Sequence, residues 1–259
     1  MAERFRLDRA RVLLSNDDGI NATGLKTLER VAKAIFREVW VVAPETEQSA
    51  SSHSLTLRRP LRIRRISKHR YAVDGTPTDS VLLGVQEVMR ETPPDIVLSG
   101  INRGGNLGED VTYSGTVAAA MEGALLGIPS VALSQVCIDR RSVRWRTAEH
   151  WLPTVLMQLV DAGWPSRVLI NVNFPDVAAK AVNGFRVVPQ GRRKIGGTLQ
   201  EGTDPRGGHY FWIGAQRDEV PFKTNSDLSA VREGEISITP LGMDLTHTAT
   251  LKRLKTMIK

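Results

Sequence analysis

Oxygen-bearing side chains recur at the points where the sequence predicts that buried strands end. Asp17 and Asp18 follow one apolar run, Asn102 and Asn106 lie in a glycine-rich loop after another, and hydroxyl residues fill residues 45–54. Adjacent carboxylates repel each other unless a cation compensates their charge. Carboxylate, amide and hydroxyl oxygens suit Mg²⁺, Mn²⁺ or Ca²⁺ better than Zn²⁺. These residues predict a hard-cation site, although an isolated Asp-Asp-Gly sequence is also typical of an Asx turn that caps a helix.

A second group of residues could hold an anion. Residues 113–126 open on the small hydroxyl residues Ser114 and Thr116 and continue as a strong helix former. The free amides at a helix N-terminus attract phosphate. Capping of the helix by Ser114 is compatible with that role. A cation beside such a helix would form a phosphoryl-transfer site.

Other phosphatase mechanisms can be tested against the sequence. A cysteine phosphatase needs an arginine six residues after its nucleophile, but Cys137 is followed at that distance by Val143. The Asp-x-Asp and Arg-His-Gly motifs of two further classes are absent, and Ser114 lacks the Gly-x-Ser-x-Gly elbow. The elimination leaves a metal-activated water. His53 either assists that chemistry or is an ordinary surface residue.

The elements that must position these side chains alternate along residues 11–134. Buried strands are predicted at residues 12–14, 38–43, 95–99 and 130–134, with helical spacing in residues 25–36 and 113–126. This alternation predicts an α/β fold with a doubly wound, mostly parallel sheet. Ligands of such sheets bind outside the carboxyl ends of the strands. Arginines alternate with apolar residues in an edge strand near residues 58–66, and Thr78 is predicted to cap the helix that follows.

The pattern loosens after residue 134. A helix is predicted at residues 145–160 and another at 244–259, and residues 191–208 are rich in glycine and basic residues with weak periodicity. The remaining apolar runs predict strands at residues 167–173, 184–188, 210–214 and 235–239.

Composition narrows the class of protein. The chain has 259 residues, of which 41% are hydrophobic and 24% charged, with one cysteine and a formal net charge of +7. No apolar run is long enough to span a bilayer, and the N-terminus lacks a signal-peptide pattern, so we expect a cytoplasmic protein without a membrane partner. The positive charge suits an anionic partner. The basic residues spread over 58–70, 139–146 and 192–194 contain no nucleic-acid-binding motif, so we expect no specific nucleic-acid partner.

Several motifs together resemble the SurE family of stationary-phase survival proteins, which act as nucleoside monophosphate phosphatases. The motifs, in order, are Ser15-Asn-Asp-Asp-Gly19, Val42-Ala-Pro44 with Ser49, Asp74-Gly-Thr-Pro-Thr-Asp79, Ser99-Gly-Ile-Asn102, Asn106-Leu-Gly108, Tyr113-Ser-Gly-Thr-Val-Ala-Ala-Ala-Met-Glu-Gly123, Asp204-Pro-Arg-Gly207 and Ser237-Ile-Thr-Pro-Leu241. The resemblance covers most of the chain, and the combination is specific where any one motif would not be.

The resemblance implies a ligand set and catalytic roles. It implies one divalent metal ion per subunit, for which we expect Mg²⁺ or Mn²⁺. We further predict that Asp17 and Asp18 are the catalytic residues and that one of the pair, Asp18 in preference, orients or deprotonates the attacking water. The implied metal ligands are Asp17, Asp18, Ser49 and Asn102, and the implied phosphate-binding residues are Asn106, Ser114, Gly115 and Thr116.

Three positions depart from the family pattern. Ala50 stands where the family usually has glycine, and Thr23 stands where proline is common before Gly24. Arg103 is basic where many relatives have a small residue. Its side chain either contacts phosphate or reaches solvent.

The resemblance also implies a Rossmann-like core and a projecting arm used in assembly. We predict a single domain over residues 1–259, with a core at about 1–190, an oligomerisation arm with a β-hairpin at about 191–237 and a C-terminal segment at 238–259. Apolar residues such as Phe211 and Trp212 would be exposed on an isolated hairpin, which predicts a homodimer or homotetramer. The alternative is an arm that folds back on its own core.

These observations predict a divalent-metal-dependent 5'-nucleotidase that hydrolyses nucleoside monophosphates to nucleoside and phosphate. A broad phosphomonoesterase or exopolyphosphatase is an alternative of the same chemical class. A non-catalytic nucleotide- or RNA-binding module is an alternative of a different class.

Overall fold

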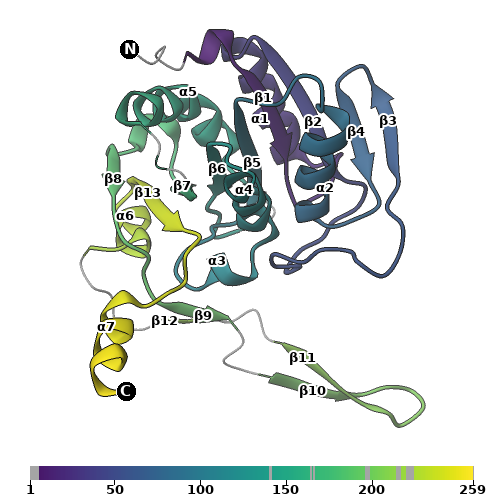
Figure 1. The fold of residues 1–259 in the computed structure, drawn as a ribbon. Coiled ribbons are helices and arrows are strands. Elements are labelled where there is room, and N and C mark those ends of the chain that lie inside the picture. Colours follow the sequence, from purple (N-terminus) through teal and green to yellow (C-terminus); the bar gives the residue numbers. More distant parts are fainter. Residues whose placement is uncertain are drawn as a thin grey trace.

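A nine-stranded sheet forms the centre of the protein, whose computed structural model describes residues 6–139, 142–163, 165, 167–195, 199–213, 217–219 and 225–258 (Figure 1). The spatial order of its strands is β3-β4-β2-β1-β5-β6-β7-β13-β8. Their bounds are β1 (Arg11–Ser15), β2 (Glu38–Pro44), β3 (Ile63–Ser67), β4 (Arg70–Val73), β5 (Ile96–Arg103), β6 (Ser130–Gln135), β7 (Val168–Phe174), β8 (Phe185–Val187) and β13 (Ile236–Gly242).

Most of the sheet is parallel. The strands β4, β2, β1, β5, β6 and β7 pair in parallel, whereas β3 and β13 run antiparallel to β4 and β7. Numbered in chain order, the six parallel strands lie in the order 3-2-1-4-5-6, which is the Rossmann order. The order reverses between β1 and β5. The predicted doubly wound, mostly parallel α/β fold is therefore confirmed.

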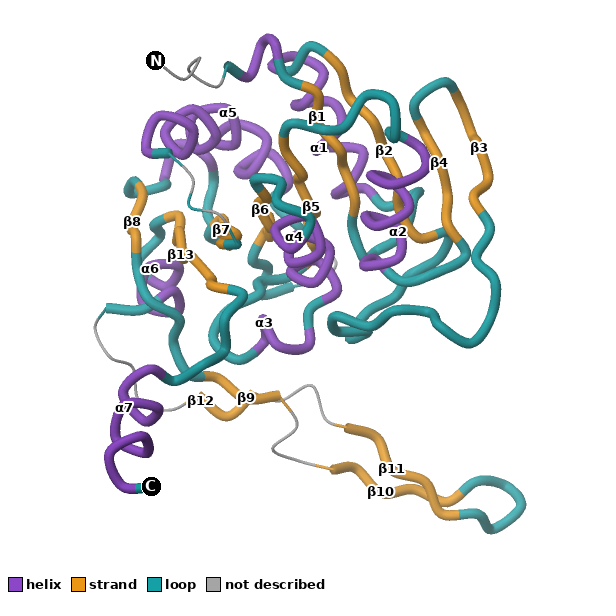
Figure 2. The backbone as a smooth tube through the Cα atoms, in the orientation of Figure 1, coloured by secondary structure: helices purple, strands orange, loops and turns teal. Residues whose placement is uncertain are grey.

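Helices cover both faces of the sheet (Figure 2). Side chains alternate between the faces along a strand, so Val12 and Leu14 belong to one core cluster and Leu13 to another. The Val12 face packs against α1 (Thr23–Ile35) and α5 (Trp145–Ala162), and the Leu13 face against α2 (Pro77–Leu83) and α4 (Gly115–Leu125).

The predicted helix cap at Thr78 is wrong by two residues. The N-cap of α2 is Thr76, whose side chain accepts a hydrogen bond from the Asp79 amide, while the Asp79 carboxylate accepts one from the Thr76 amide. Pro77 explains the shift, because proline favours the first helical position and holds the preceding residue in extended conformation.

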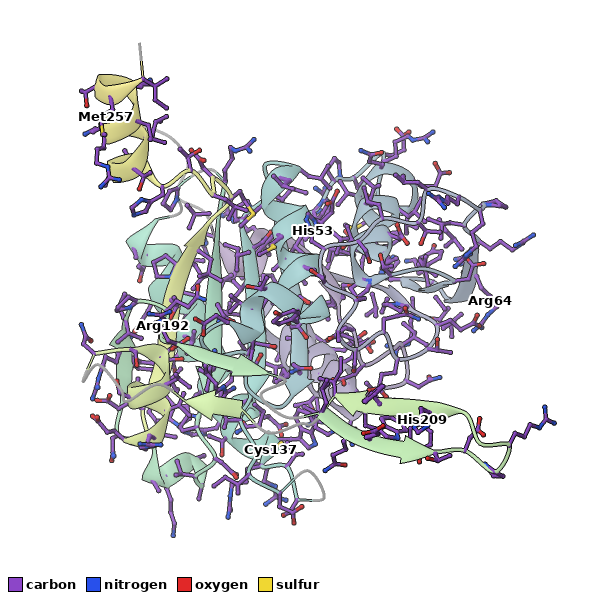
Figure 3. All side chains as sticks on the ribbon, turned by 90° about the horizontal axis from the view of Figure 1, so that it is seen from below. His53, Arg64, Cys137, Arg192, His209 and Met257 are labelled. Carbon is purple, nitrogen blue, oxygen red and sulfur yellow. The ribbon has the colours of Figure 1, made fainter. Side chains whose placement is uncertain are left out.

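The C-terminal part leaves the body of the protein and returns to it. A short pair, β9 (Arg193–Ile195) and β12 (Arg217–Glu219), lies at the root of a hairpin formed by β10 (Leu199–Thr203) and β11 (His209–Ile213). Seen from below, the hairpin with His209 and the helix with Met257 both extend beyond the body (Figure 3). Residues 196–198, 214–216 and 220–224 of the predicted arm lie outside the described residues.

The core continues beyond the arm. The buried helix α6 (Asp227–Arg232) packs on β13, which occupies the sheet between β7 and β8. The last helix, α7 (Thr248–Met257), has no buried residue. Short turns of helix at α3 (Asp110–Tyr113), η1 (Leu7–Arg9), η2 (Gly84–Val88) and η3 (Ala179–Ala181) complete the described elements. Among these helices, none has the length and apolar character needed to cross a membrane.

Candidate active site

The strands β1 and β5 end side by side at the point where the strand order reverses. Ser15 at the end of β1 is in register with Ser99 of β5, so the residues that follow each strand meet at the carboxyl edge of the sheet. A cavity of about 180 Å³ opens there. Most of the predicted site residues line it, namely Asp17, Asp18, Ser49, Asn102, Asn106 and Ser114, whereas Gly115 and Thr116 do not.

Asp17 is held by the start of α4. Its carboxylate accepts a hydrogen bond from the buried hydroxyl of Thr116, and its side chain is only 5% exposed. A Cβ at Gly115 would lie 2.6 Å from the Cβ of Asp17, so glycine permits the close approach. The side chain of Thr116 therefore orients a carboxylate rather than lining the cavity.

Burial changes the protonation of Asp17. The loss of water around the carboxyl raises its pKa to about 6, the hydrogen bond from Thr116 opposes this shift, and the charge of Asp18 adds to it. Binding of a cation would compensate both the burial and the repulsion, since it favours the charged form.

The raised pKa of Asp17 predicts a pH dependence for the protein without metal. The pKa of Asp17 is higher in the folded state than its ordinary value of 3.8. The protonated carboxyl therefore contributes to the stability of the fold, fully below pH 3.8, and this contribution is lost as the pH rises through about 6. The variant Asp17→Asn lacks this titration. In the presence of a chelator, we expect the melting temperature of the variant to rise relative to that of the native protein as the pH is raised from about 4 to 7. A difference that does not change with pH would contradict the role of this carboxyl.

The serine-rich loop reaches the cavity from β2. The Gln48 amide donates to the Asp17 carbonyl at 2.8 Å, and the Ser49 hydroxyl donates to Oε1 of Glu47 at 2.7 Å. Ser52 anchors the far end of the loop through its hydroxyl, which donates to the Thr112 carbonyl at 2.9 Å. Ala50 lies between these anchors with a φ of 59°, a left-handed conformation that favours glycine. A glycine at this position, which is usual in the family that the sequence resembles, would adopt this conformation without strain.

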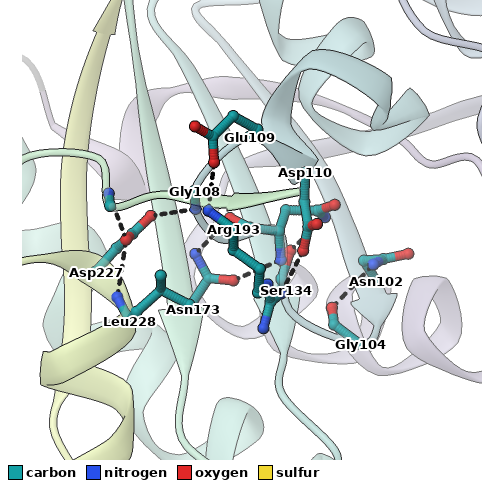
Figure 4. Close-up of polar contacts among 12 residues, drawn as sticks. Asn102, Gly104, Gly108, Glu109, Asp110, Ser134, Asn173, Arg193, Asp227 and Leu228 are labelled. Atoms are coloured by element: carbon teal, nitrogen blue, oxygen red, sulfur yellow. Dashed lines mark hydrogen bonds and ion pairs between the residues drawn. The ribbon is translucent and has the colours of Figure 1, made fainter. Parts of the chain in front are cut away.

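Asn102 lines the cavity near the end of β5. Its Nδ2 donates to the Gly104 carbonyl at 2.9 Å, so Oδ1 is the atom that can serve a cation (Figure 4). The backbone amide of Arg103 donates to Oδ2 of Asp18 at 3.3 Å. The close packing of α1 against this strand depends on Gly24, where a Cβ would lie 1.8 Å from the Ile101 carbonyl oxygen.

A buried amide network holds Asn106. Its Nδ2 donates to the Ser134 hydroxyl at 2.8 Å, and its backbone amide donates to Oδ1 of Asn173 at 2.8 Å. Its carbonyl accepts from Nδ2 of Asn171 at 2.9 Å and of Asn173 at 3.1 Å. None of these three partners of Asn106 was predicted from the sequence. The available signal was the presence of polar residues inside the apolar runs of β6 and β7.

Ser114 is the N-cap of α4, as predicted. Its hydroxyl oxygen accepts from the Val117 amide at 3.0 Å, which leaves its proton for a ligand in the cavity. His53 lies elsewhere: its Nε2 is 3.0 Å from Oε2 of Glu122, on a later turn of α4, and it does not line the cavity.

Known proteins resemble this chain in sequence and in fold. The family model described as Survival protein SurE matches residues 12–197. The chain belongs to the SurE family. The resemblance stated from the motifs is therefore confirmed.

Individual relatives cover nearly the whole chain. The 5'-nucleotidase SurE of Paramagnetospirillum magneticum is 62% identical over 246 residues, which cover 95% of each chain. That of Parvibaculum lavamentivorans is 52% identical over 247 residues, which cover 94% of this chain and 89% of the relative. The crystal structure of the SurE protein from Aquifex aeolicus is 38% identical, with a TM-score of 0.84 over 96% of this chain and all of that one.

A further cluster of polar contacts in this SurE family member connects β9, at the base of the hairpin, to the loop that carries Asn106. The guanidinium of Arg193 pairs with the buried carboxylate of Asp110, which lines the cavity, and the Arg193 amide donates to the carboxylate of Glu109 (Figure 4). Asp227 accepts from the Gly108 amide at 2.8 Å through Oδ2. Through Oδ1 it accepts from the Gly191 amide, also at 2.8 Å. These contacts fasten β9 and α6 to the loop that carries Asn106.

The donor set of the site fits a hard divalent cation. Within the described part of the chain, no group of three or more His, Cys, Asp and Glu residues is arranged to hold a metal. A cation beside Asp17 and Asp18 would therefore complete its coordination with neutral oxygens, of which Ser49 and Asn102 line the same cavity. Hard cations such as Mg²⁺ accept that mixture of carboxylate, neutral oxygen and water.

Proposed function

We propose that this chain is a metal-dependent 5'-nucleotidase, which hydrolyses nucleoside monophosphates to nucleoside and phosphate. The observation that carries the proposal is the convergence of Asp17, Asp18 and Asn102 with the anion-binding groups Asn106 and Ser114 in one cavity at the strand-order reversal. Relatives that are 52% and 62% identical and are named 5'-nucleotidase support the same activity. A cytoplasmic location remains our expectation.

One divalent ion per subunit, Mg²⁺ or Mn²⁺, would be held by Asp17, Asp18, Ser49 and Asn102. Such an ion would polarise a phosphoryl oxygen and lower the pKa of a bound water. Four residues from the ends of two strands and from the serine-rich loop would then share the task of binding it.

Side chains of the protein would carry out the proton transfer and bind the phosphoryl group. Asp18 is partly exposed whereas Asp17 is buried against Thr116, so Asp18 is the carboxylate that can take a proton from the attacking water. The second amide hydrogen of Asn106 and the hydroxyl of Ser114 would donate to the phosphoryl oxygens. Donors fixed before the reaction stabilise the charge that develops on those oxygens.

Neutral ligands contribute less to cation affinity than carboxylates do. We therefore expect Ser49→Ala and Asn102→Ala to raise the metal concentration needed for half-maximal activity by about tenfold, with recovery at excess metal. The control is Ser54→Ala, a hydroxyl of the same loop that does not line the cavity. Metal titrations with native midpoints for both variants would remove these residues from the ligand set.

The hairpin of β10 and β11 is proposed as an assembly surface. It exposes a run of apolar side chains, with Phe211 62%, Trp212 69% and Ile213 71% accessible. An isolated hairpin is marginal in water, and an exposed apolar patch of this kind indicates an interface. A second copy of the chain would cover the patch in a closed dimer or tetramer.

Shortening the hairpin should reduce the assembly. We expect the intact protein to be a dimer or tetramer at micromolar concentration. A version without residues 199–213 should form an assembly with fewer subunits. Light scattering measures both, and a version that lacks residues 248–259 controls for truncation elsewhere. A monomeric intact protein, or an unchanged assembly after shortening, would contradict the proposal.

The proposed activity is tested by phosphate release from a panel of substrates. We expect release from nucleoside monophosphates and slower release from simple phosphomonoesters and inorganic polyphosphate. Equal or faster turnover of the simple esters or polyphosphate would favour the broader phosphatase. Binding of nucleotides or RNA without phosphate release would favour the non-catalytic module, and tight sequence-selective DNA binding would contradict the expected absence of a specific nucleic-acid partner.

A further inference from the structure

The segment that follows Ser49 has a strained backbone. Ala50 and Ser52 have φ values of 59° and 52°, in the left-handed region that residues with a side chain rarely adopt. Residues in such a conformation persist only where the surrounding structure holds them. Both lie directly after a proposed metal ligand, so the contacts of this segment must also hold Ser49 in place.

The backbone on either side of residue 53 is anchored to the body of the protein. The Ser52 amide donates to the Tyr113 carbonyl at 3.2 Å, next to the start of α4. The Thr56 amide donates to Oδ1 of Asp79 at 3.0 Å, in the first turn of α2. Both anchors use backbone amides, and residue 53 lies between them, so a contact of its side chain would fix the segment at a third point.

The side chain of His53 makes that third contact. Its Nε2 is 3.0 Å from Oε2 of Glu122, whose side chain is only 11% exposed. An ionised carboxylate accepts hydrogen bonds and donates none, so Nε2 is the donor. A carboxylate with so little access to water needs a hydrogen-bonding partner, and His53 supplies one. The pair therefore connects the segment after Ser49 to α4, the helix whose N-cap is Ser114.

We propose that His53 is a positioning residue for the cation, because its contact with Glu122 holds the strained segment that places the Ser49 hydroxyl in the cavity. That hydroxyl donates its proton to Glu47, which leaves the lone pairs of its oxygen for a cation. His53 itself contacts neither the cation nor the substrate. The assignment rests on the proposed metal-dependent function, and it gives His53 a role between the two that the sequence left open.

Binding of Mn²⁺ to the chelator-stripped protein, measured by calorimetry without substrate, tests the assignment. The variant His53→Ala removes the contact, whereas His53→Gln keeps an amide that can donate to Glu122. A third variant adds Ala50→Gly to His53→Ala. The control is His69→Ala, which breaks a contact of 3.6 Å with Glu38. His69 and Glu38 are both 27% exposed, similar to the 31% of His53, and neither lines the cavity.

We expect His53→Ala to weaken Mn²⁺ binding by about tenfold, as the loss of a residue that orients a metal ligand does. Its kcat at saturating Mn²⁺ should stay within about twofold of the native value, because excess metal restores the occupied site. His53→Gln should keep most of the affinity. The added Ala50→Gly should recover part of it, since glycine adopts a positive φ without strain. His69→Ala should bind Mn²⁺ as the native protein does.

Native Mn²⁺ affinity in His53→Ala would overturn the positioning role, and so would an equal loss in His69→Ala. A loss that neither His53→Gln nor the added glycine reduces would overturn it as well. The proposed function fails separately. If the native protein binds Mn²⁺ with the expected differences among the variants but releases no phosphate from adenosine 5'-monophosphate, the nucleotidase proposal is wrong and the role of His53 stands. If the native protein binds no Mn²⁺, both proposals fail.

Discussion

We expect Asp18→Asn to lower the rate of phosphate release by about 10²–10⁴-fold, the range that a positioned general base contributes, and to leave the fold intact. We expect Asp17→Asn to lower it at least as far, because Asp17 is buried and its carboxylate would supply charge to the cation that asparagine cannot. Neither change should destabilise the protein without metal. Burial is the main cause of the raised pKa of Asp17, and the charge of Asp18 adds to it, so the replacement of either carboxylate removes an unfavourable charge interaction.

The measurement is single-substrate kinetics at saturating metal, with circular dichroism to verify the fold. Asp161→Asn, at an exposed position near the end of α5, is the matched control and should retain native rates. If either site variant kept a near-native rate at saturating metal, that residue would not be an essential ligand or base.

We expect Arg193→Met to destabilise the protein by about 3–5 kcal/mol, the usual cost of removing one partner of a buried ion pair. The side chains of Arg193 and Asp110 are only 10% and 3% exposed. In the variant, the carboxylate of Asp110 would therefore stay buried without a counter-ion and with little access to water. Asp110 also lines the cavity, and the Arg193 amide holds Glu109 beside it. We therefore expect KM for the nucleotide to rise in the same variant.

Two comparisons separate this effect from a general loss of a positive charge. Arg186→Met breaks more exposed ion pairs with Glu233 and Glu235, for which we expect a much smaller loss of stability. The double change Arg193→Met with Asp110→Asn removes the stranded charge and should recover part of the lost stability. Urea denaturation that gave equal losses for Arg193→Met and Arg186→Met, with no recovery in the double variant, would contradict the role of the pair.

The fold was largely predictable because its signals are local. Apolar runs such as Val12 to Leu14 mark strands buried on both sides, and helical spacing marks the helices that cover them. The residues after β1 and β5 could then be placed together, since parallel strands bring their carboxyl ends to one edge. The cap at Ser114 was likewise predictable, because the first turn of a helix is read from a few adjacent residues.

Contacts between distant segments carried no such signal. Arg193 and Asp110 are 83 residues apart, and nothing in the weakly periodic stretch 191–208 indicates which of its basic residues enters the core. Thr116 shows a related limit. A small hydroxyl residue at a helix start suits either a bound phosphate or a neighbouring carboxylate, and only the position of Asp17 identifies the partner.

The most direct test is phosphate release from a nucleoside monophosphate by chelator-stripped protein during titration with Mn²⁺. We predict no release from the stripped protein, followed by recovery that saturates at one Mn²⁺ per subunit in the native chain and fails in Asp17→Asn. Full activity in the presence of chelator, or recovery in that variant equal to the native protein, would contradict a cation site at the ends of β1 and β5.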